Sequence, residues 1–411
     1  MKIALVTQYF WPESFSINDL AKTLVEQGHT VEVFTGKPNY PEGKIFPGYD
    51  AVGCSQETYG PGIKIHRVPL RPRGAGGAKN LLFNYLSFVF NGLRYFPKQV
   101  RGKDFDVVFV FTLSPITSVI PAIYLKWKLK KHLAIWVLDL WPESLQATGF
   151  IQNKYILAAV GWMVRAIYGA TDTILVQSRA FVQAVSRYAD SRKIIYYSNS
   201  YKDTPLTAAG PTQIPSDLLD VLDTHFCLVF AGNLGTAQAV ETLMAAAERL
   251  QHLADFRLIL VGSGSMSGWL QQQKQDRGLD NVILAGRYPA EEMPQFFQRA
   301  RALVVSLKRA EIFAQTVPAK VQSYLAAGRP IIAALDGEGA RVVQEAGAGL
   351  VCAAEDVDGL VRCIEGLYNM APTDRDALGQ AGRRYFLENF EMGKQASRLI
   401  DILQRRIDGT Y

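Results

Sequence analysis

The first half of the chain alternates short apolar runs with longer segments whose apolar residues have helical spacing. The run at 2–8 leads into a helical pattern through Leu20 and Leu24, then Gly28, and then a second apolar run at 30–35. A strand, a helix that ends at glycine and another strand form a βαβ unit. Further apolar runs occupy 62–68, 106–112, 133–140 and 172–178. This alternation predicts a parallel sheet covered by helices on both faces.

A second series of the same kind follows residues 201–224, where prolines and small polar residues replace the periodic pattern. The apolar runs beyond this stretch are 226–232, 256–262, 281–286, 302–307, 330–335 and 348–352, with helical segments such as 237–250 and 317–327 between them. A chain of 411 residues is long enough for two cores. We therefore predict two doubly wound α/β domains, at 1–200 and 225–385, joined by a linker at 201–224.

Charge is unevenly distributed along the chain. Residues 58–138 contain 13 Lys and Arg but only two acidic residues, Asp104 and Asp106, and the basic residues flank an aromatic stretch at 80–96. This combination favours an anionic membrane surface as the partner of segment 64–103, and not nucleic acid. A core-facing amphipathic helix with solvated lysines would give the same pattern, and periodicity alone does not separate the two.

Several features predict a cytoplasmic protein, peripheral on the inner face of the membrane. The four cysteines have no paired spacing, which argues against a zinc site or a disulfide framework. The N-terminus has no hydrophobic signal sequence. Residues 107–125 carry no charge, but Pro115 and Pro121 interrupt them, so a strand, a turn and a helix are expected there and not a membrane crossing.

The tetrapeptide Trp-Pro-Glu-Ser occurs at 11–14 and again at 141–144, each time after an apolar run. Doubly wound sheets bind ligands at the carboxyl ends of their strands, which is where both copies are predicted to lie. A tryptophan face beside a glutamate suits sugar hydroxyls. The alternative is a strand-to-helix turn in which the serine caps the next helix.

Three segments of the second half are suited to phosphate. Gly232, Asn233 and Gly235 lie between a predicted strand and helix, and Gly262 and Gly264 follow the next strand. Bare backbone at such a junction can approach a phosphate, although some of these glycines serve only tight packing. In the third segment, Pro318 precedes a helix whose first turn offers the amides near Thr316 and Val317 together with the charge of Lys320. A diphosphate is the expected ligand, and the spacing is not that of a Walker loop.

These motifs together resemble a known family. The segments that carry the resemblance are 28–49, 138–144, 232–238, 261–264 and 317–333. The chain resembles the retaining glycosyltransferases numbered family four, whose two Rossmann-like domains face a cleft (the GT-B fold), and within them the bacterial enzymes that build lipid-linked surface polysaccharides, including the colanic-acid and fucosamine-transferring types. The resemblance implies an acceptor in the first domain, a nucleotide diphospho-sugar in the second, and a last helix, 386–411, that crosses back to the first domain.

The resemblance also implies roles for individual residues. The sugar would be transferred with retention, by attack from the face that the diphosphate leaves, without a protein nucleophile or a metal and with uridine as the expected base. Asp139 is expected to orient or deprotonate the acceptor hydroxyl; a helix cap is its alternative role. The catalytic residues expected are Asp139, Lys320 and Glu143. The donor residues expected are Gly232, Asn233, Gly235, Gln238, Gly262, Gly264, Arg287, Lys308, Thr316, Val317, Lys320 and Ser323. The acceptor residues expected are Glu13, Trp11, Asn39, Tyr40 and Trp141.

The sequence departs from the family at two positions. The family usually carries two glutamates where this chain has Gln315 and Ser323. Glu311 could replace the first, and the Ser323 hydroxyl could contact the ribose in place of the second. The departure keeps a second interpretation open, a catalytically degenerate partner subunit that binds a sugar nucleotide. A sugar-nucleotide epimerase of the same fold is a third, but it would need acidic and histidine residues for proton abstraction.

Overall fold

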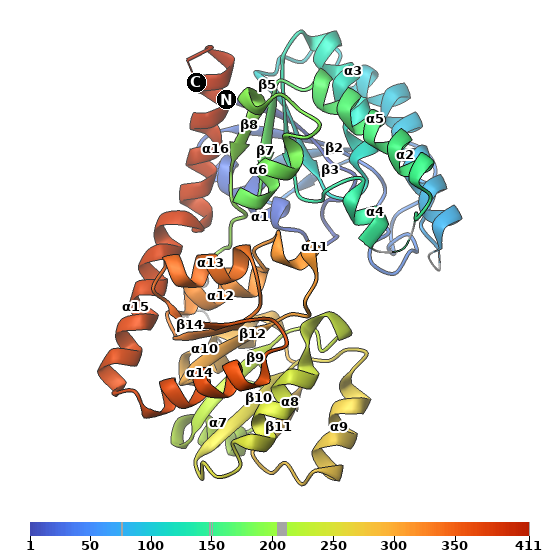
Figure 1. The fold of residues 1–411 in the computed structure, drawn as a ribbon. Helices are drawn as coiled ribbons and strands as arrows, with labels where there is room; N and C mark the ends of the chain where they lie inside the picture. Colours follow the sequence, from blue (N-terminus) through green and yellow to red (C-terminus); the bar gives the residue numbers. More distant parts are fainter. Residues whose placement is uncertain (75–76, 148, 150, 204–211, 411) are drawn as a thin grey trace. The chain divides into compact units, whose positions relative to one another are not determined.

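The computed structural model describes residues 1–74, 77–147, 149, 151–203 and 212–410, which form two compact units. The first unit is Met1–Ser200 with Met392–Tyr411, and the second is Tyr201–Glu391 (Figure 1). Residues 204–211 of the predicted linker lie outside the described residues. Part of that predicted linker is helical, because Ser216–Thr224 forms α7 and buries Leu218 and Leu222.

The first unit contains an eight-stranded sheet in the order β3-β4-β2-β1-β5-β6-β7-β8. Its strands are β1 (Lys2–Val6), β2 (Thr30–Thr35), β3 (Ser55–Tyr59), β4 (Ile63–Arg67), β5 (Val107–Thr112), β6 (His132–Val137), β7 (Thr173–Val176) and β8 (Ile194–Tyr196). All pairs are parallel except β3 with β4. The six predicted strands are confirmed. The sequence missed β3, an edge strand whose side chains are not buried, and β8, which has only three residues.

Helices cover both faces of this sheet, as predicted. They are α1 (Ser16–Glu26), α2 (Ala78–Gln99), α3 (Ile120–Leu129), α4 (Glu143–Ala147), α5 (Lys154–Ala170), α6 (Arg179–Val185) and α16 (Met392–Ile407). Side chains of β1 alternate between the two faces of the sheet. Ala4 and Val6 lie in the core with α2, α3, α5 and α6, whereas Ile3 and Leu5 lie in the core with α1 and α16. The strand, turn and helix predicted within Val107–Leu125 are confirmed as β5, the 3₁₀ turn Ile116–Val119 and α3.

The second unit contains a six-stranded, all-parallel sheet in the order β11-β10-β9-β12-β13-β14. Its strands, all predicted, are β9 (Phe226–Ala231), β10 (Phe256–Val261), β11 (Val282–Gly286), β12 (Ala302–Ser306), β13 (Ile331–Ala334) and β14 (Gly349–Cys352). Its other helices are α8 (Val240–Arg249), α9 (Ser267–Asp276), α10 (Met293–Arg299), α11 (Glu311–Ala314), α12 (Ala319–Ala327), α13 (Glu338–Glu345), α14 (Val357–Asn369) and α15 (Pro372–Asn389). The helix predicted over 237–250 starts later, because Ala239 takes a left-handed conformation with φ of 47°.

Neither unit contains a helix long and apolar enough to span a bilayer among the residues described. Both sheets run parallel around β1 and β9, so the carboxyl ends of those central strands gather at one edge of each sheet. The glycine loops and both tetrapeptides follow strands at these edges.

Candidate active site

Two loops at the edge of the second sheet touch through glycine. Gly232 follows β9 and Gly262 follows β10, with φ angles of 135° and 139°. A Cβ atom on Gly262 would lie 1.9 Å from the carbonyl oxygen of Gly232, so a larger residue would force the loops apart. Glycine at these positions therefore permits the close approach of two strand ends.

The N–H groups of these glycines are already hydrogen-bonded within the unit. The Gly232 N–H donates to the Val261 carbonyl over 2.8 Å, and the Gly262 N–H donates to the Gly286 carbonyl over 2.7 Å. The Gly264 N–H donates to the Ser267 hydroxyl over 2.9 Å. Of these three bonds, only the one from Gly232 links the two loops, because Gly262 bonds the end of β11 and Gly264 bonds its own loop. The predicted approach of a phosphate to this backbone stays a prediction.

A cavity of about 360 Å³ lies beside the two loops. It is lined by Gly232, Asn233, Val261, Gly262, Ser263, Arg287, Tyr288 and Met293. The N–H groups of Asn233 and Ser263 donate to no atom within the described part of the chain, and Arg287 adds an exposed cation. The Tyr288 ring packs edge-on against Phe296 with centroids 5.1 Å apart. The cavity thus combines hydrogen-bond donors and a cation with an aromatic wall.

Sequence reasoning found four of these lining residues and the loop that carries Val261 and Ser263, but it missed Tyr288 and Met293. Tyr288 directly follows Arg287, just after the glycine that ends β11. The predicted strand could therefore have placed Tyr288 at the carboxyl edge of the sheet. Met293 begins α10, which the sequence did not single out.

Lys320 reaches the same loops from α12. A Cβ atom on Gly232 would lie 2.7 Å from Lys320 Cε, so the lysine side chain lies against that glycine. Its Nζ donates to the Gln238 Oε1 atom and lies 4.0 Å from the centroid of the Phe230 ring. No carboxylate of the described residues pairs with it, and burial lowers its pKa to about 8. The site therefore holds a partly buried cation that no carboxylate of the described residues balances.

Three other predicted donor residues have partners within the unit. Lys308 Nζ lies 3.1 Å from the Glu241 carboxylate, and both side chains are partly exposed. Gly235 packs against Asn233, whose amide nitrogen would lie 2.7 Å from an added Cβ atom. Gln238 is the acceptor for Lys320, so it positions that lysine.

The segment before α12 is packed more tightly than the sequence implied. Val317 is buried in the core, and the Thr316 N–H and hydroxyl both donate to the Phe313 carbonyl, over 3.4 and 3.3 Å. These contacts leave Thr316 turned toward its own chain and not toward an anion. Glu311, the possible substitute for a family glutamate, is exposed and accepts from Gln315 over 3.3 Å.

Ser323 lies away from the glycine loops. Its hydroxyl donates to the Lys320 carbonyl over 3.0 Å, and it lines a different cavity of about 390 Å³ beside Asp203 and Arg383. Asp203 and Arg383 form an ion pair of 2.6 Å. Ser323 and the loop glycines therefore line different cavities, and the expected contact of its hydroxyl with the ribose stays a prediction.

The first tetrapeptide has a structural role. Glu13 is 2% exposed, and its carboxylate accepts the N–H groups of Phe10, Asn39 and Tyr40 over 3.1, 2.8 and 2.7 Å. Burial raises its pKa to about 7, against the opposing effect of these donors. The expectation that Glu13 offers its oxygens to an acceptor is contradicted, since it ties the loop after β1 to the loop after β2.

The other predicted acceptor residues near Glu13 also make contacts within the first unit. Trp11 stacks on Tyr59 with ring centroids 5.1 Å apart. Asn39 is fully buried and accepts the Arg73 N–H over 3.1 Å. The Tyr40 ring stays partly exposed, and the Arg73 guanidinium lies 5.0 Å from its centroid. Of these acceptor residues, Tyr40 is the most exposed, and it lies beside Arg73, which the sequence did not single out.

The second tetrapeptide has a different geometry. Trp141 is 9% exposed, and its indole N–H donates to Ser114 over 3.1 Å and to the Asp139 carboxylate over 3.3 Å. The Ser144 hydroxyl donates to the other Asp139 oxygen. Glu143 begins α4, where the Tyr188 hydroxyl approaches within 3.5 Å. Asp139 and Glu143 are only partly buried, so they are the accessible carboxylates of this loop.

The capping alternative is wrong for both serines. Ser14 does not cap α1, which begins at Ser16 after Phe15 and has no side-chain cap. Ser144 lies inside α4 and bonds Asp139. The repeated tetrapeptide therefore builds two different local structures.

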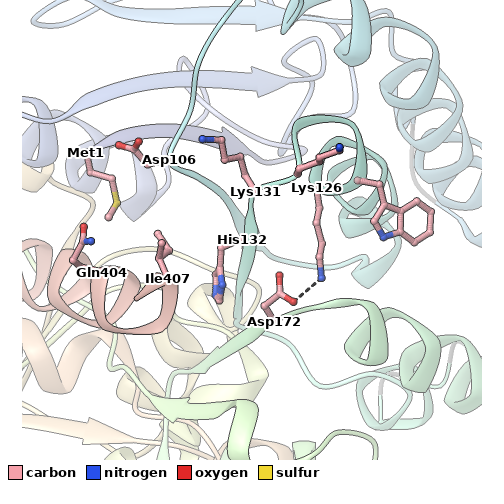
Figure 2. A pocket seen from close by; sticks show the side chains of 10 residues that line it. Met1, Asp106, Lys126, Lys131, His132, Asp172, Gln404 and Ile407 are labelled. Atoms are coloured by element: carbon pink, nitrogen blue, oxygen red, sulfur yellow. Dashed lines mark hydrogen bonds and ion pairs between the residues drawn. The ribbon is translucent and has the colours of Figure 1, made fainter. Parts of the chain in front are cut away.

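A larger cavity in the first unit lies away from this edge. It measures about 870 Å³, and its walls include Met1, Asp106, His132 and Asp172 (Figure 2). These residues lie at or before the amino ends of β1, β5, β6 and β7, whereas ligands of doubly wound sheets bind at the carboxyl ends. The Lys126 ammonium at this cavity is paired with Asp172 over 2.6 Å. We therefore do not assign the active site there.

No group of three or more His, Cys, Asp or Glu side chains could hold a metal ion among the residues described. The expectation of metal-free transfer stays a prediction.

Comparison with known proteins gives consistent results for both units. Residues 15–199 match the glycosyl transferase 4-like domain, and residues 225–370 match the glycosyl transferases group 1. The chain is 23% identical over 379 residues to the putative colanic acid biosynthesis glycosyl transferase WcaI of Escherichia coli K12, covering 89% of this chain and 88% of that protein. It is 26% identical over 402 residues to the O-antigen chain mannosyltransferase C of Escherichia coli, covering 95% and 94%. The solved structure of Anabaena HepE in complex with UDP matches with a TM-score of 0.67 and 12% identity, covering 98% of this chain and 100% of that one.

Proposed function

The chain belongs to the two-domain glycosyltransferases of group 1, with the GT-B fold, and from that premise we propose that it moves a sugar from a nucleotide diphospho-sugar to a lipid-linked saccharide, with retention, in surface polysaccharide synthesis. Two relatives named for colanic acid and O-antigen synthesis support the pathway class. UDP in the HepE complex supports uridine as the base, with guanosine second. The acceptor proposed is polyprenyl diphosphate-linked.

The observation that carries the proposal is the partly buried, unbalanced charge of Lys320. Removing a cation from water without a carboxylate partner is costly unless an anion arrives to pair with it. Lys320 lies against Gly232, beside a cavity whose donors are Arg287 and the free amides of Asn233 and Ser263. A diphosphate brings the missing charge and enough oxygens for these donors. Tyr288 and Met293 then offer an apolar wall for the base.

The proposed reaction breaks the bond between the sugar C1 and the diphosphate oxygen and forms a bond between C1 and an acceptor oxygen. The acceptor proton passes to the departing diphosphate on the same face, or to Asp139. Lys320 and Arg287 stabilise the charge that develops on the leaving group. Glu143 and Tyr40 orient the acceptor sugar, and Arg73 attracts its phosphate. No metal is required in this scheme.

A non-catalytic partner subunit is the second candidate, because Gln315 and Ser323 replace the acidic residues usual in the family. An epimerase is disfavoured, since no acidic residue or histidine lines the cavity at the glycine loops.

One experiment separates these functions. Purified protein is incubated with UDP- and GDP-sugars and a bacterial lipid extract, and products are followed by mass spectrometry. A glycolipid that gains one sugar mass supports transfer. Nucleotide binding by calorimetry without any product indicates a partner subunit, and interconversion of the nucleotide sugar itself indicates an epimerase.

Transfer should fall at alkaline pH because of Lys320. Its pKa of about 8 keeps the side chain charged at pH 7, and the charge disappears as the pH rises past that value. We expect kcat/KM to fall roughly tenfold per pH unit above pH 8, since this parameter reports ionisation of the free enzyme. The Lys320→Arg variant should move this decline to higher pH. A flat profile up to about pH 9.5 would assign the leaving-group role to another residue.

A further inference from the structure

Three neighbouring helices of the first unit expose apolar side chains that the core does not use. Helix α3 contacts both α2 and α5, so the three helices are neighbours (Figure 1). We call the outward surface of α2, α3 and α5 the three-helix face. Each helix has an ordinary buried side, which includes Phe88 of α2, Leu125 of α3 and Val164 of α5.

The exposed side of α2 carries five large apolar residues. Leu82, Leu86 and Phe90 follow one another at intervals of four residues, and Phe83 and Leu93 flank them on the same side of the helix. Phe90 is 65% exposed. A helix at a protein surface normally turns polar residues to water, so this side is built for another apolar medium.

The other two helices continue the pattern with aromatic residues. Tyr124 and Trp127 are exposed on α3, and Tyr155, Ile156 and Trp162 are exposed on α5. Trp162 is 70% exposed. Tryptophan and tyrosine are the residues that settle at the boundary between lipid headgroups and acyl chains, because their rings are apolar and their N–H or O–H groups stay wet.

The charges of the three helices all have one sign. Lys and Arg occur seven times in Ala78–Gln99, Ile120–Leu129 and Lys154–Ala170, whereas Asp and Glu do not occur there. The whole chain has 38 acidic residues in 411. Lys79, Arg94 and Lys98 of α2 are exposed, as are Lys128 and Arg165 on the other two helices. A surface of cations and aromatic rings without a carboxylate is complementary to anionic lipid.

Helix α16 gives an internal comparison, because it covers the opposite face of the same sheet. It buries Leu399 and Leu403 and presents Lys394, Asp401 and Arg405 to solvent, the usual arrangement of an amphipathic helix. Apart from Ile407 at its end, α16 keeps its large apolar residues buried or partly buried, unlike α2, α3 and α5.

We propose that the three-helix face docks on the surface of an anionic bilayer, with the aromatic side chains inserted among the headgroups. This inference rests on the proposed function, since a lipid-linked acceptor lies in such a surface. It widens the expected contact from segment 64–103 to helices that continue to Ala170. The docked unit would contact one leaflet only, and cations of all three helices would lie near the lipid phosphates.

The test is co-sedimentation with vesicles of phosphatidylcholine alone or with 30% phosphatidylglycerol, an anionic fraction of roughly physiological size. The protein should bind the anionic vesicles and should be released as the salt concentration rises. The double variant Phe90→Glu with Trp162→Glu should bind them at least about tenfold more weakly. The control Leu387→Glu with Ile407→Glu adds the same charge at exposed apolar residues outside the face and should bind like the parent protein.

Several results would contradict the docking proposal or assign the face to another partner. Equal vesicle binding by the parent protein and the double variant would overturn the proposal, as would no binding by the parent protein. If the parent protein is a dimer that does not bind vesicles, and the double variant is a monomer, the face would be assigned to a second copy of the chain. If the double variant fails to fold, the charge reversal of Lys79, Arg94 and Lys98 provides the same comparison. Sugar transfer to a short-chain, water-soluble acceptor is read in parallel, so that loss of docking and failure of the proposed function are distinguished.

Discussion

Replacing Lys320 with methionine should lower kcat by about 100- to 1,000-fold, the usual effect of removing one group that stabilises charge in a transition state. Methionine keeps the length and apolar contacts of the lysine stem against Phe230 and Gly232, so the change removes the cation and little else. The measurement is steady-state release of nucleotide diphosphate, with folding checked by circular dichroism.

Lys308→Met is the matched control for this prediction. Lys308 also lies near the β9 loop, but it is partly exposed and already paired with Glu241. Its loss should change kcat less than about tenfold, because an exposed pair contributes little. Equal losses in the two variants would mean that general positive charge, and not the unpaired ammonium of Lys320, supports the reaction.

Replacing Glu13 with alanine should destabilise the first unit by about 3 to 5 kcal/mol, a large effect for one residue. The change leaves the N–H groups of Phe10, Asn39 and Tyr40 without their acceptor in a buried site. Urea denaturation followed by tryptophan fluorescence is suitable, because five of the six tryptophans lie in the first unit.

Replacing Glu143 with alanine tests the glutamate of the second copy of the tetrapeptide, at 141–144. Glu143 is partly exposed, and Arg187 approaches it only to 3.9 Å, so the loss of stability should be below about 1 kcal/mol. Its effect should fall on transfer and not on folding. A loss below about 1 kcal/mol for Glu13→Ala as well would show that the loop after β2 is held by other contacts.

The buried strands could be predicted from sequence because a strand covered on both faces is a continuous apolar run. β2, for example, was found at the residues where it occurs. The edge strand β3 was not, because "SQETY" has no apolar run and its pairing with β4 depends on the next strand along the chain. The glycine loops could be located in the same way, because each one directly follows a predicted buried strand.

The roles of individual site residues were harder to predict, because they depend on partners distant in sequence. The two copies of Trp-Pro-Glu-Ser are identical, yet Glu13 meets the amides of residues 39 and 40 while Glu143 meets Tyr188. The sequence likewise did not show that the Gly232 and Gly262 amides bond the backbone of neighbouring strands. The absence of acidic residues from three helices was visible in the sequence, whereas the exposure of their apolar side chains needed the fold.

The central claim is that Lys320 and the loops after β9 and β10 hold a nucleotide diphosphate. A crystal of the full chain soaked with UDP and, separately, GDP tests it directly. The account predicts density for the diphosphate within about 3 Å of Lys320 Nζ, with the base against Tyr288. Nucleotide bound elsewhere, with the Lys320 ammonium still bonded only to Gln238, would contradict it.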